Sequence, residues 1–306
     1  MHAQSAREVR PRRSPTRALL ASLRPAQWVK NGVILIPAVF ALKATDPSVM
    51  LRALVAVVAF CLLSGATYLG NDLADRERDR AHPEKRRRAI ASGELSVRAA
   101  AWTGALLGLA GLGLSLSLGF PFFATAAGYV LLQAAYSTYL KRLAVVDVFA
   151  IAGGFVLRVV AGAEAVPVPI SNWLYLTTLF LALFLALEKR RAELTLLGAE
   201  ASRHRGILSE YDVALVDQLV AIAGGATVMT YSLYTLSPDT LAKFGSDRLK
   251  LTIPFVLFGV FRYLHLVHRR GAGGEPERVL VRDRGMQLTL LGYIATVAWA
   301  IYMRTP

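Results

Sequence analysis

The sequence predicts an all-α, polytopic membrane protein, a helical bundle of about nine transmembrane helices. Of its 306 residues, 55% are hydrophobic and only 18% are charged, whereas soluble domains are about 45–50% apolar and about 25% charged. The mean hydropathy is +0.45, and apolar stretches of about 20 residues, each long enough to cross a bilayer, recur along the chain. A water-soluble enzyme is therefore disfavoured. Although the net charge is +14, the hydrophobicity also argues against a partner that is a nucleic acid.

The expected spans cover most of the chain after its N-terminal region. They are 26–42, 51–71, 98–117, 120–140, 144–163, 171–188, 214–236, 250–268 and 286–303. The first span is the weakest, because Pro25 and Pro37 flank or interrupt it. A short turn around Gly119 separates the third span from the fourth. We expect residues 1–23, which are rich in Arg, Pro and Ser, to be a disordered basic tail, and residues 24–306 to be a single transmembrane domain.

The distribution of basic residues predicts the orientation of the bundle in the membrane. Most of the 35 Lys and Arg residues fall in the N-terminal region up to residue 30 and in 72–98, 141–142, 189–205 and 262–284. Cytoplasmic loops carry such an excess. We therefore expect a cell (inner) membrane protein with this side and the N-terminus in the cytoplasm and, with nine spans, the C-terminus outside. The single cysteine, Cys61, excludes an internal disulfide and a zinc site with several cysteines.

An acidic motif follows directly on the second expected span. Asp72, Asp75 and Asp79 are spaced three and four residues apart, so that a helix would place them on one face, with Asn71 and Tyr68 near the same face. Three carboxylates so close together repel one another unless a cation is present. Mg²⁺ takes oxygen ligands of this kind and completes its shell with water and substrate phosphates. The alternative is a solvated face on a helix that leaves the membrane. The motif favours a Mg²⁺–diphosphate site.

Several basic clusters are expected on the same side of the membrane as the aspartates. They are the segment 24–31, which includes Lys30; the run 82–93, which includes Lys85 and Arg88; Lys141 and Arg142; and Lys189, Arg190 and Arg191. Each cluster could be a membrane anchor or part of the cytoplasmic excess of positive charge. Because they converge on one side, we expect a cytoplasm-facing active-site cavity with an acidic metal-binding wall and basic phosphate-binding walls.

The fifth expected span contains two ionisable residues, Asp147 and Arg158. They are about three helical turns apart and share one face. Ionisable residues within a span usually face the bundle interior or a water-filled cavity. The sequence leaves open whether the two residues join the site or pair structurally. It also leaves open whether the loop 189–212 is a lid or a substrate-facing helix. We find no P-loop, Rossmann fingerprint or GxSxG motif in a credible context.

The N-D-x-x-D-x-x-x-D motif at the end of the second of about nine spans resembles the UbiA superfamily of intramembrane prenyltransferases. The matching segments are 24–31, 68–93, 136–162 and 189–194. Ala89 stands where the family pattern has proline. Members that use a prenyl diphosphate carry a second Asp-rich motif after the sixth span, whereas this chain has the largely basic run from Glu188 to Glu193. A second metal site is thereby weakened and an anion site is gained.

Within the superfamily, the chain is therefore most similar to members that transfer 5-phosphoribose to decaprenyl phosphate. The resemblance implies Mg²⁺-dependent transfer from 5-phosphoribosyl 1-diphosphate to a polyprenyl phosphate lipid, for the synthesis of cell-wall arabinan. One alternative is a prenyltransferase that moves a prenyl group from a prenyl diphosphate to an aromatic acceptor. Another is a transporter or channel, whose carboxylates should lie nearer the bilayer midplane. The sequence determines neither the acceptor chain length nor whether the chain forms a homo-oligomer.

The resemblance also implies roles for individual residues. The implied catalytic residues are Asp72, Asp75 and Asp79, which with Asn71 would bind Mg²⁺. The implied substrate-binding residues are Lys30, Tyr68, Lys85, Arg88, Lys141, Arg142, Arg158, Lys189, Arg190 and Arg191. Among these, Lys85, Arg88, Lys141 and Arg142 would hold the donor's phosphates, and the basic run 189–191 would position the lipid phosphate.

Overall fold

A computed structural model of the chain describes residues 14–82, 85–197, 206–270, 279 and 282–303. Every regular element within these ranges is a helix. The long helices are α3 (Pro47–Ala74), α6 (Val97–Ser117), α7 (Phe120–Thr138), α8 (Val146–Ala165), α9 (Asn172–Leu197), α11 (Val213–Leu236), α13 (Ile253–Arg270) and α15 (Arg284–Tyr302). Each corresponds to one of the expected spans from 51–71 onward, although α9 continues well past its expected end at residue 188.

The chain is a multi-pass membrane protein. Within the described residues, six helical segments are long and apolar enough to cross a bilayer: α3, α6, α8, α11, the segment 248–269, which includes all of α13 but its last residue, and α15. The turn between α6 and α7 is short, as predicted, because Gly119 adopts a φ of 115° that favours glycine.

The first expected span, 26–42, is not a continuous transmembrane α-helix, and that prediction is wrong. Residues Pro25–Leu35 form a 3-10 helix, η1, and only Ile36–Phe40 form an α-helix, α2. Pro37 lies at the start of α2, where a missing backbone N–H is tolerated. The segment packs tightly on α8, since a Cβ atom at Gly162 would collide with the backbone carbonyl of Ile34.

The expected disordered tail is also wrong for residues 15–23, which form the helix α1 (Pro15–Leu23). Residues 1–13 lie outside the described residues. Ser14 caps the helix by accepting a hydrogen bond from the backbone N–H of Arg17 at 3.4 Å. Ala18 is fully buried in a cluster that also contains Leu69 of α3. Capping and tertiary packing therefore stabilise a helix that the composition of the segment does not indicate.

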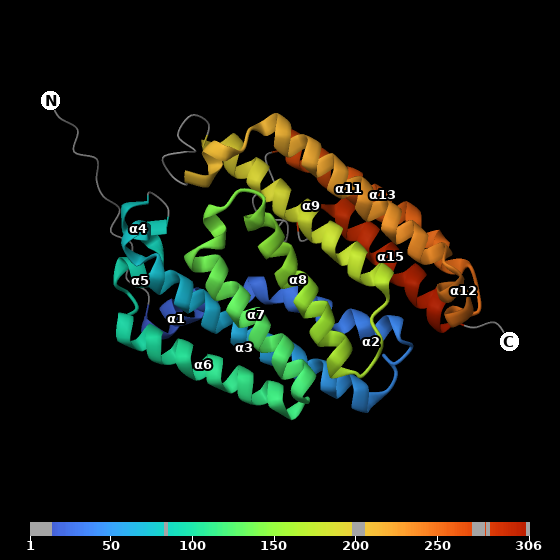
Figure 1. Ribbon diagram of the computed structural model, residues 1–306, viewed down its shortest axis with the longest axis horizontal. Helices are drawn as coiled ribbons and strands as arrows, with labels where there is room; N and C mark the ends of the chain where they lie inside the picture. Colours follow the sequence, from blue (N-terminus) through green and yellow to red (C-terminus); the bar gives the residue numbers. More distant parts are fainter. Residues whose placement is uncertain (1–13, 83–84, 198–205, 271–278, 280–281, 304–306) are drawn as a thin grey trace.

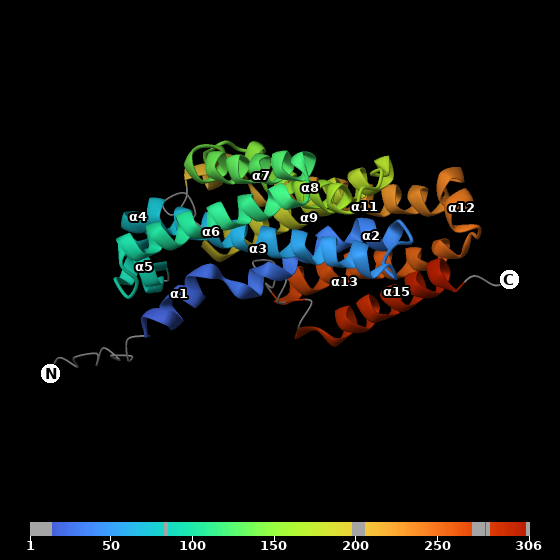
Figure 2. The same ribbon diagram turned by 90° about the horizontal axis from the view of Figure 1, so that it is seen from below.

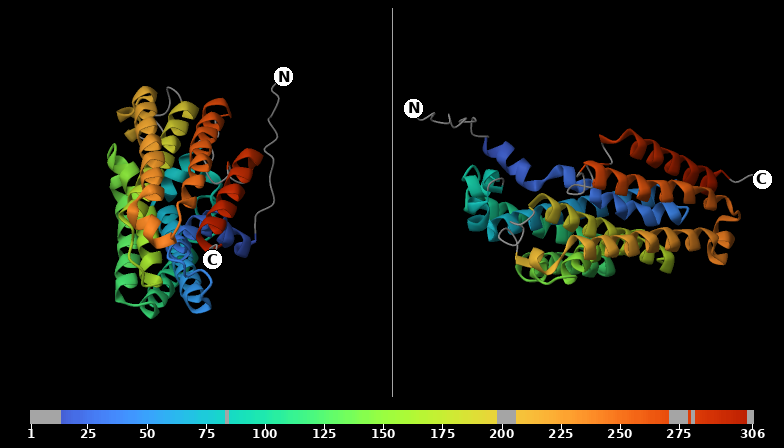
Figure 3. Two further views of the ribbon diagram at one scale, coloured as in Figure 1. Left: turned by 90° about the vertical axis from the view of Figure 1, so that its right-hand side faces the viewer. Right: turned by 90° about the horizontal axis from the view of Figure 1, so that it is seen from above.

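The helices lie side by side, so that the bundle has two distinct ends (Figure 1). The short helices α4 (Arg76–Ala81) and α5 (Ala89–Ser92) lie at one end, and α2 and α12 (Pro238–Phe244) lie at the other. Figure 2 shows α1 beside α5. Figure 3 shows α15 next to α13 at one edge of the bundle. The acidic motif joins α3 to α4 and therefore lies at the end that α1 approaches.

Candidate active site

The acidic motif spans a short interruption between two helices. Helix α3 ends at Ala74, and α4 begins at Arg76. The helical hydrogen-bond pattern nevertheless continues across Asp75, because its N–H donates to the Asn71 carbonyl at 2.9 Å and its carbonyl accepts from the Asp79 N–H at 2.8 Å. The predicted common face is thus kept. Asp72 and Asp79 are buried, whereas Asn71 and Asp75 are half-buried.

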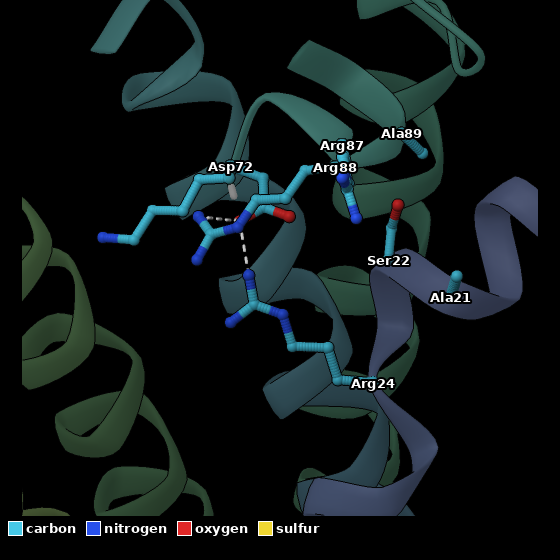
Figure 4. Close-up of a pocket in the computed structure, with 8 residues that line it drawn as sticks. Ala21, Ser22, Arg24, Asp72, Arg87, Arg88 and Ala89 are labelled. Atoms are coloured by element: carbon cyan, nitrogen blue, oxygen red, sulfur yellow. Dashed lines mark hydrogen bonds and ion pairs between the residues drawn. The ribbon is translucent and has the colours of Figure 1, made fainter. Parts of the chain in front are cut away.

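Two arginines from different parts of the chain meet the buried aspartates. One nitrogen of Arg88, Nη1, donates to Asp72 Oδ1 at 3.0 Å and to Asp79 Oδ2 at 2.7 Å. Nη2 of Arg24 donates to the same Asp72 oxygen at 2.5 Å (Figure 4). The structure therefore brings Arg88, one of the basic residues singled out in the sequence, into contact with two of the three aspartates.

The third aspartate, Asp75, contacts a basic residue from a different segment of the chain. Lys141 Nζ lies 2.9 Å from both Asp75 carboxylate oxygens. Lys141 belongs to η3 (Leu140–Arg142), a 3-10 turn between α7 and α8. Arg142 on the same turn is exposed, as is Lys85, and Lys30 of η1 is half-buried. The carboxylates are therefore approached from the N-terminal segment, from the run after α4 and from the α7–α8 turn.

Arg24 was not predicted as a site residue, although it belongs to the basic segment 24–31. Arg24 joins α1 to η1 with a φ of 52°, a left-handed conformation that is uncommon for residues other than glycine. Its guanidinium group also lies over the Tyr68 ring, 4.9 Å from the centroid. Tyr68 thus lies near the aspartates, as predicted, and orients a cation there. Arg24 precedes Asp72 by 48 residues, so that no local spacing indicates the pair.

A cavity of about 310 Å³ opens beside this cluster (Figure 4). It is lined by Ala21, Ser22, Arg24, Asp72, Lys85, Arg87, Arg88 and Ala89. Helix α1, which was expected to be part of a disordered tail, supplies one wall. Four of the lining residues are cationic and one is acidic, so that the cavity suits an anionic ligand.

The basic segment after the sixth span differs from the expectation at Arg190. This side chain is buried, and Nε donates to Asp147 Oδ2 at 2.6 Å. Nη1 donates to Glu193, and Nη2 donates to the Tyr136 hydroxyl at 3.3 Å. Arg190 therefore joins α8 to α9 through carboxylates of the chain itself. Asp147, whose role the sequence left open, pairs structurally.

Tyr211, which follows η5 (Gly206–Glu210), completes this network. Its hydroxyl donates to Asp147 Oδ1 at 2.8 Å and accepts from the Val145 N–H at 2.6 Å. Burial and the hydrogen bond to Asp147 raise the pKa of Tyr211 to about 12. Val145 has a φ of 67°, which is strained for a β-branched residue. The tyrosine thus holds an unusual backbone turn at the start of α8.

The two neighbours of Arg190 lie in different environments. Arg191 Nε lies 2.5 Å from Asp217 Oδ1 of α11, whereas Lys189 is exposed. Of the three basic residues predicted to bind the lipid phosphate, two therefore pair with carboxylates.

Arg158 lies in the bundle interior and contacts none of the three aspartates. Nε donates to Asn31 Oδ1 at 2.8 Å, Nη1 to the Gly154 carbonyl at 2.7 Å, and Nη2 to the Tyr129 hydroxyl at 2.9 Å. None of these partners is a carboxylate, and Arg158 forms no ion pair within the described ranges. Its contacts join η1, α7 and α8 around a buried charge.

The carboxylate and amide oxygens of the site are ligands of the kind that Mg²⁺ prefers. No three His, Cys, Asp or Glu residues in the described part of the chain are close enough to hold a metal ion, since Asp75 turns to Lys141. Asp72 and Asp79, however, direct one oxygen each at the same Arg88 nitrogen. Two carboxylate oxygens that converge on one positive charge fit as two of the ligands of Mg²⁺, with water and phosphate needed to complete its shell.

Fold and site together define a multi-pass helical membrane protein with a carboxylate and cation site at one end of its bundle. The model of the UbiA prenyltransferase family matches residues 33–279. The chain belongs to this family and is a UbiA-type transferase.

Similar proteins agree with this assignment. The chain is 34% identical to a decaprenyl-phosphate phosphoribosyltransferase of Mycolicibacterium smegmatis, over 96% of this chain and 97% of that protein. It is 28% identical to nodulation protein NoeC of Azorhizobium caulinodans, over 92% of each chain. The fold is similar to that of a UbiA homologue from Archaeoglobus fulgidus bound to GPP and Mg²⁺, with a TM-score of 0.72, 19% identity, and coverage of 93% of this chain and 99% of that one.

Proposed function

We propose that the protein transfers 5-phosphoribose from 5-phosphoribosyl 1-diphosphate to a polyprenyl phosphate in a Mg²⁺-dependent reaction. The products are polyprenylphosphoryl-5-phosphoribose and diphosphate, and the lipid product would serve cell-wall arabinan synthesis. Similarity to the decaprenyl-phosphate phosphoribosyltransferase over nearly the whole chain supports the proposal. In this proposal the aspartate end faces the cytoplasm, and the lipid acceptor enters from the membrane.

The lining of the cavity beside Asp72 is the observation on which the choice of donor rests. A prenyl diphosphate ends in a hydrocarbon chain, which gains nothing from cations. A phosphoribosyl diphosphate has a further phosphate at its far end, and cations bind that phosphate favourably. Among the described residues, the lining has Arg24, Lys85, Arg87 and Arg88 against the carboxylate of Asp72 and includes no large apolar side chain. This lining favours the donor with two anionic ends.

In this proposal, the acidic motif binds the metal. Asn71, Asp72, Asp75 and Asp79 would hold Mg²⁺, either directly or through water. Bound Mg²⁺ would supply neutralisation of the negative charge that develops on the departing diphosphate. The residues Arg24, Arg88 and Lys141 already compensate the carboxylates. They would turn to the phosphate oxygens when the metal and the donor bind.

The transfer breaks the bond between ribose carbon 1 and the diphosphate oxygen and forms a bond from carbon 1 to an acceptor phosphate oxygen. Carbon 1 gains oxocarbenium character, as in glycosyl transfer generally. The attacking group is already an anion, so that no general base is required. We assign Lys141 and Arg142 to the donor's phosphates and Lys189 and Arg191 to the lipid phosphate.

Four further residues would support these groups without meeting the reacting atoms. Tyr68 would orient Arg24, and Lys30, half-buried on η1, would approach the substrate from that segment. Arg190 would position α9 relative to α8 and thereby place Lys189 at the site. Arg158 would hold η1, α7 and α8 together beneath it.

Two neighbouring arginines provide a test of the donor assignment. Arg87 lines the cavity and forms no ion pair within the described part of the chain, whereas Arg86, also exposed, does not line it. We expect Arg87→Gln to raise KM for 5-phosphoribosyl 1-diphosphate by roughly tenfold or more, the effect of one charge-assisted contact. Arg86→Gln should leave KM unchanged. Equal effects of both substitutions would contradict a specific phosphate contact, and failure to use this donor at all would refute the proposed function.

A further inference from the structure

A second cavity, also of about 310 Å³, lies at the end of the bundle opposite the aspartates. It is enclosed by α2, the connection from α8 to α9, the first turn of α9, the end of α11, and α12. Its lining comprises Pro37, Phe40, Ala41, Val168 to Leu174, Tyr234, Ser237, Asp239, Thr240 and Lys243. The elements α2 and α12 lie far from α4 and α5 in Figure 1, so that this cavity takes no part in the proposed transfer.

Aromatic side chains form much of the interior of this cavity. Phe40 of α2, Trp173 of α9 and Tyr234 of α11 come from three elements that meet there. The rings of Phe40 and Tyr234 lie edge to face, with centroids 5.8 Å apart. Aromatic residues gather where membrane spans reach the lipid–water interface. An aromatic lining at the end of the bundle opposite the aspartates suits a position at the level of lipid headgroups.

The rim has one charge of each sign. Asp239 and Lys243 are one helical turn apart on α12, and both are exposed. Neither forms an ion pair within the part of the chain that the structure describes. Partial burial of the Lys243 amine lowers its pKa. A negative charge in the first turn of α12 and a positive charge in its last turn both interact favourably with the helix dipole. The dipole therefore explains the signs of the two charges, but it does not explain why a cavity lies beside them.

The surface next to the cavity is apolar. Leu236, at the end of α11, is 51% exposed, and Leu233 is 44% exposed. Both precede the cavity residue Ser237 on a helix that is long and apolar enough to span the membrane. An acyl chain could lie along these leucines while its headgroup occupies the cavity.

We propose that this cavity binds the headgroup of a zwitterionic phospholipid. The ammonium of Lys243 would receive the lipid phosphate, and the carboxylate of Asp239 would receive the lipid's ammonium group. The faces of Trp173 and Tyr234 would add a favourable contact with that ammonium group. An anionic lipid such as phosphatidylglycerol would satisfy Lys243 but, because it has no ammonium group, would leave the Asp239 carboxylate without a cation. The site therefore selects between lipid classes by charge.

Native mass spectrometry of the purified full-length protein in detergent tests this proposal without reference to catalysis. We would titrate phosphatidylethanolamine and phosphatidylglycerol with identical acyl chains and compare the bound fractions. The wild-type protein should retain phosphatidylethanolamine in preference. Lys243→Gln should weaken its binding on the order of tenfold, the effect of one charge-assisted contact. Asp239→Asn should reduce the preference and improve binding of phosphatidylglycerol.

The same end of the protein offers a matched control. Asp247 and Lys250 form an exposed ion pair, and neither lines the cavity. Asp247→Asn and Lys250→Gln should therefore leave lipid retention unchanged. Equal retention of both lipids by the wild-type protein would overturn the proposal. So would a loss of phosphatidylethanolamine binding in the control variants equal to the loss in Lys243→Gln. An unchanged lipid preference in Asp239→Asn would also overturn it. Because all four residues are exposed, a size-exclusion profile suffices to check the fold of each variant.

Discussion

Replacing Arg88 with glutamine tests the hypothesis that the acidic motif binds a cation. One nitrogen of Arg88 bridges Asp72 and Asp79, whose side chains are only 3% and 5% exposed. Removing one partner from a buried pair costs about 3–5 kcal/mol. Asp72 keeps its contact with Arg24, so that we take the lower value, ~3 kcal/mol. At roughly 2–4 °C per kcal/mol, the midpoint of thermal unfolding should fall by about 6–12 °C.

Mg²⁺ should reverse most of this loss. In Arg88→Gln, the two aspartate oxygens no longer have the guanidinium between them, and a divalent cation can take its place. A ligand at 100 times its Kd stabilises the folded state by about 2.7 kcal/mol. In the wild-type protein Mg²⁺ has to displace Arg88, and therefore its effect should be smaller. Thermal unfolding followed by tryptophan fluorescence in detergent, with and without MgCl₂, measures both quantities.

Two control variants separate this explanation from a general loss of packing. In the wild-type protein a single nitrogen of Arg88 bridges both aspartates, and the ammonium group of Arg88→Lys can take its place. Arg88→Lys should therefore lose much less stability than Arg88→Gln. Asp79→Asn combined with Arg88→Gln should lose the Mg²⁺ effect. If Mg²⁺ stabilises the wild-type protein and Arg88→Gln equally, or fails to stabilise Arg88→Gln, the metal does not bind between Asp72 and Asp79 and the reasoning is refuted.

The remaining predictions concern groups away from the aspartates. Tyr211→Phe removes the hydrogen bond to Asp147 and should destabilise the protein by about 1–3 kcal/mol, measured by thermal unfolding. Because the folded pKa of Tyr211 is about 12 against a usual 10.0, its stabilising effect is complete below about pH 10 and is lost towards pH 12. Tyr211→Phe should flatten the pH profile of stability in that range, and an unchanged profile would contradict the assignment. Gly162→Ala should lower stability and yield because of the Ile34 carbonyl, whereas Gly225→Ala, with free space around it, should be neutral or stabilising by up to ~1 kcal/mol.

The long helices were predictable because crossing a membrane requires a length of apolar chain that few other structures need. The segments that differ from the prediction depend on tertiary contacts. Residues 25–40 form a 3-10 helix and a short α-helix where two prolines and the contact with Gly162 replace a regular span. Helix α1 forms because Ala18 is buried against α3, and the composition of the N-terminal region contains no sign of this packing.

The site was predictable to the extent that it is local. The spacing of Asp72, Asp75 and Asp79 indicates one face even though α3 ends among them. The sequence could not show which cation meets which carboxylate, because Arg24 and Asp72 come together only in the fold. Nor could it show that Arg190 meets carboxylates of the chain itself, because a guanidinium group pairs equally well with an aspartate and with a phosphate.

A donor assay is the decisive test of phosphoribosyl transfer by this protein. Purified protein in detergent would receive a polyprenyl phosphate, Mg²⁺ and radiolabelled 5-phosphoribosyl 1-diphosphate, and a parallel reaction would receive a labelled prenyl diphosphate with an aromatic acceptor. We expect lipid-extractable label from the first reaction alone, and its loss when Mg²⁺ is chelated. Transfer of label in the second reaction alone would contradict the account and identify a prenyltransferase.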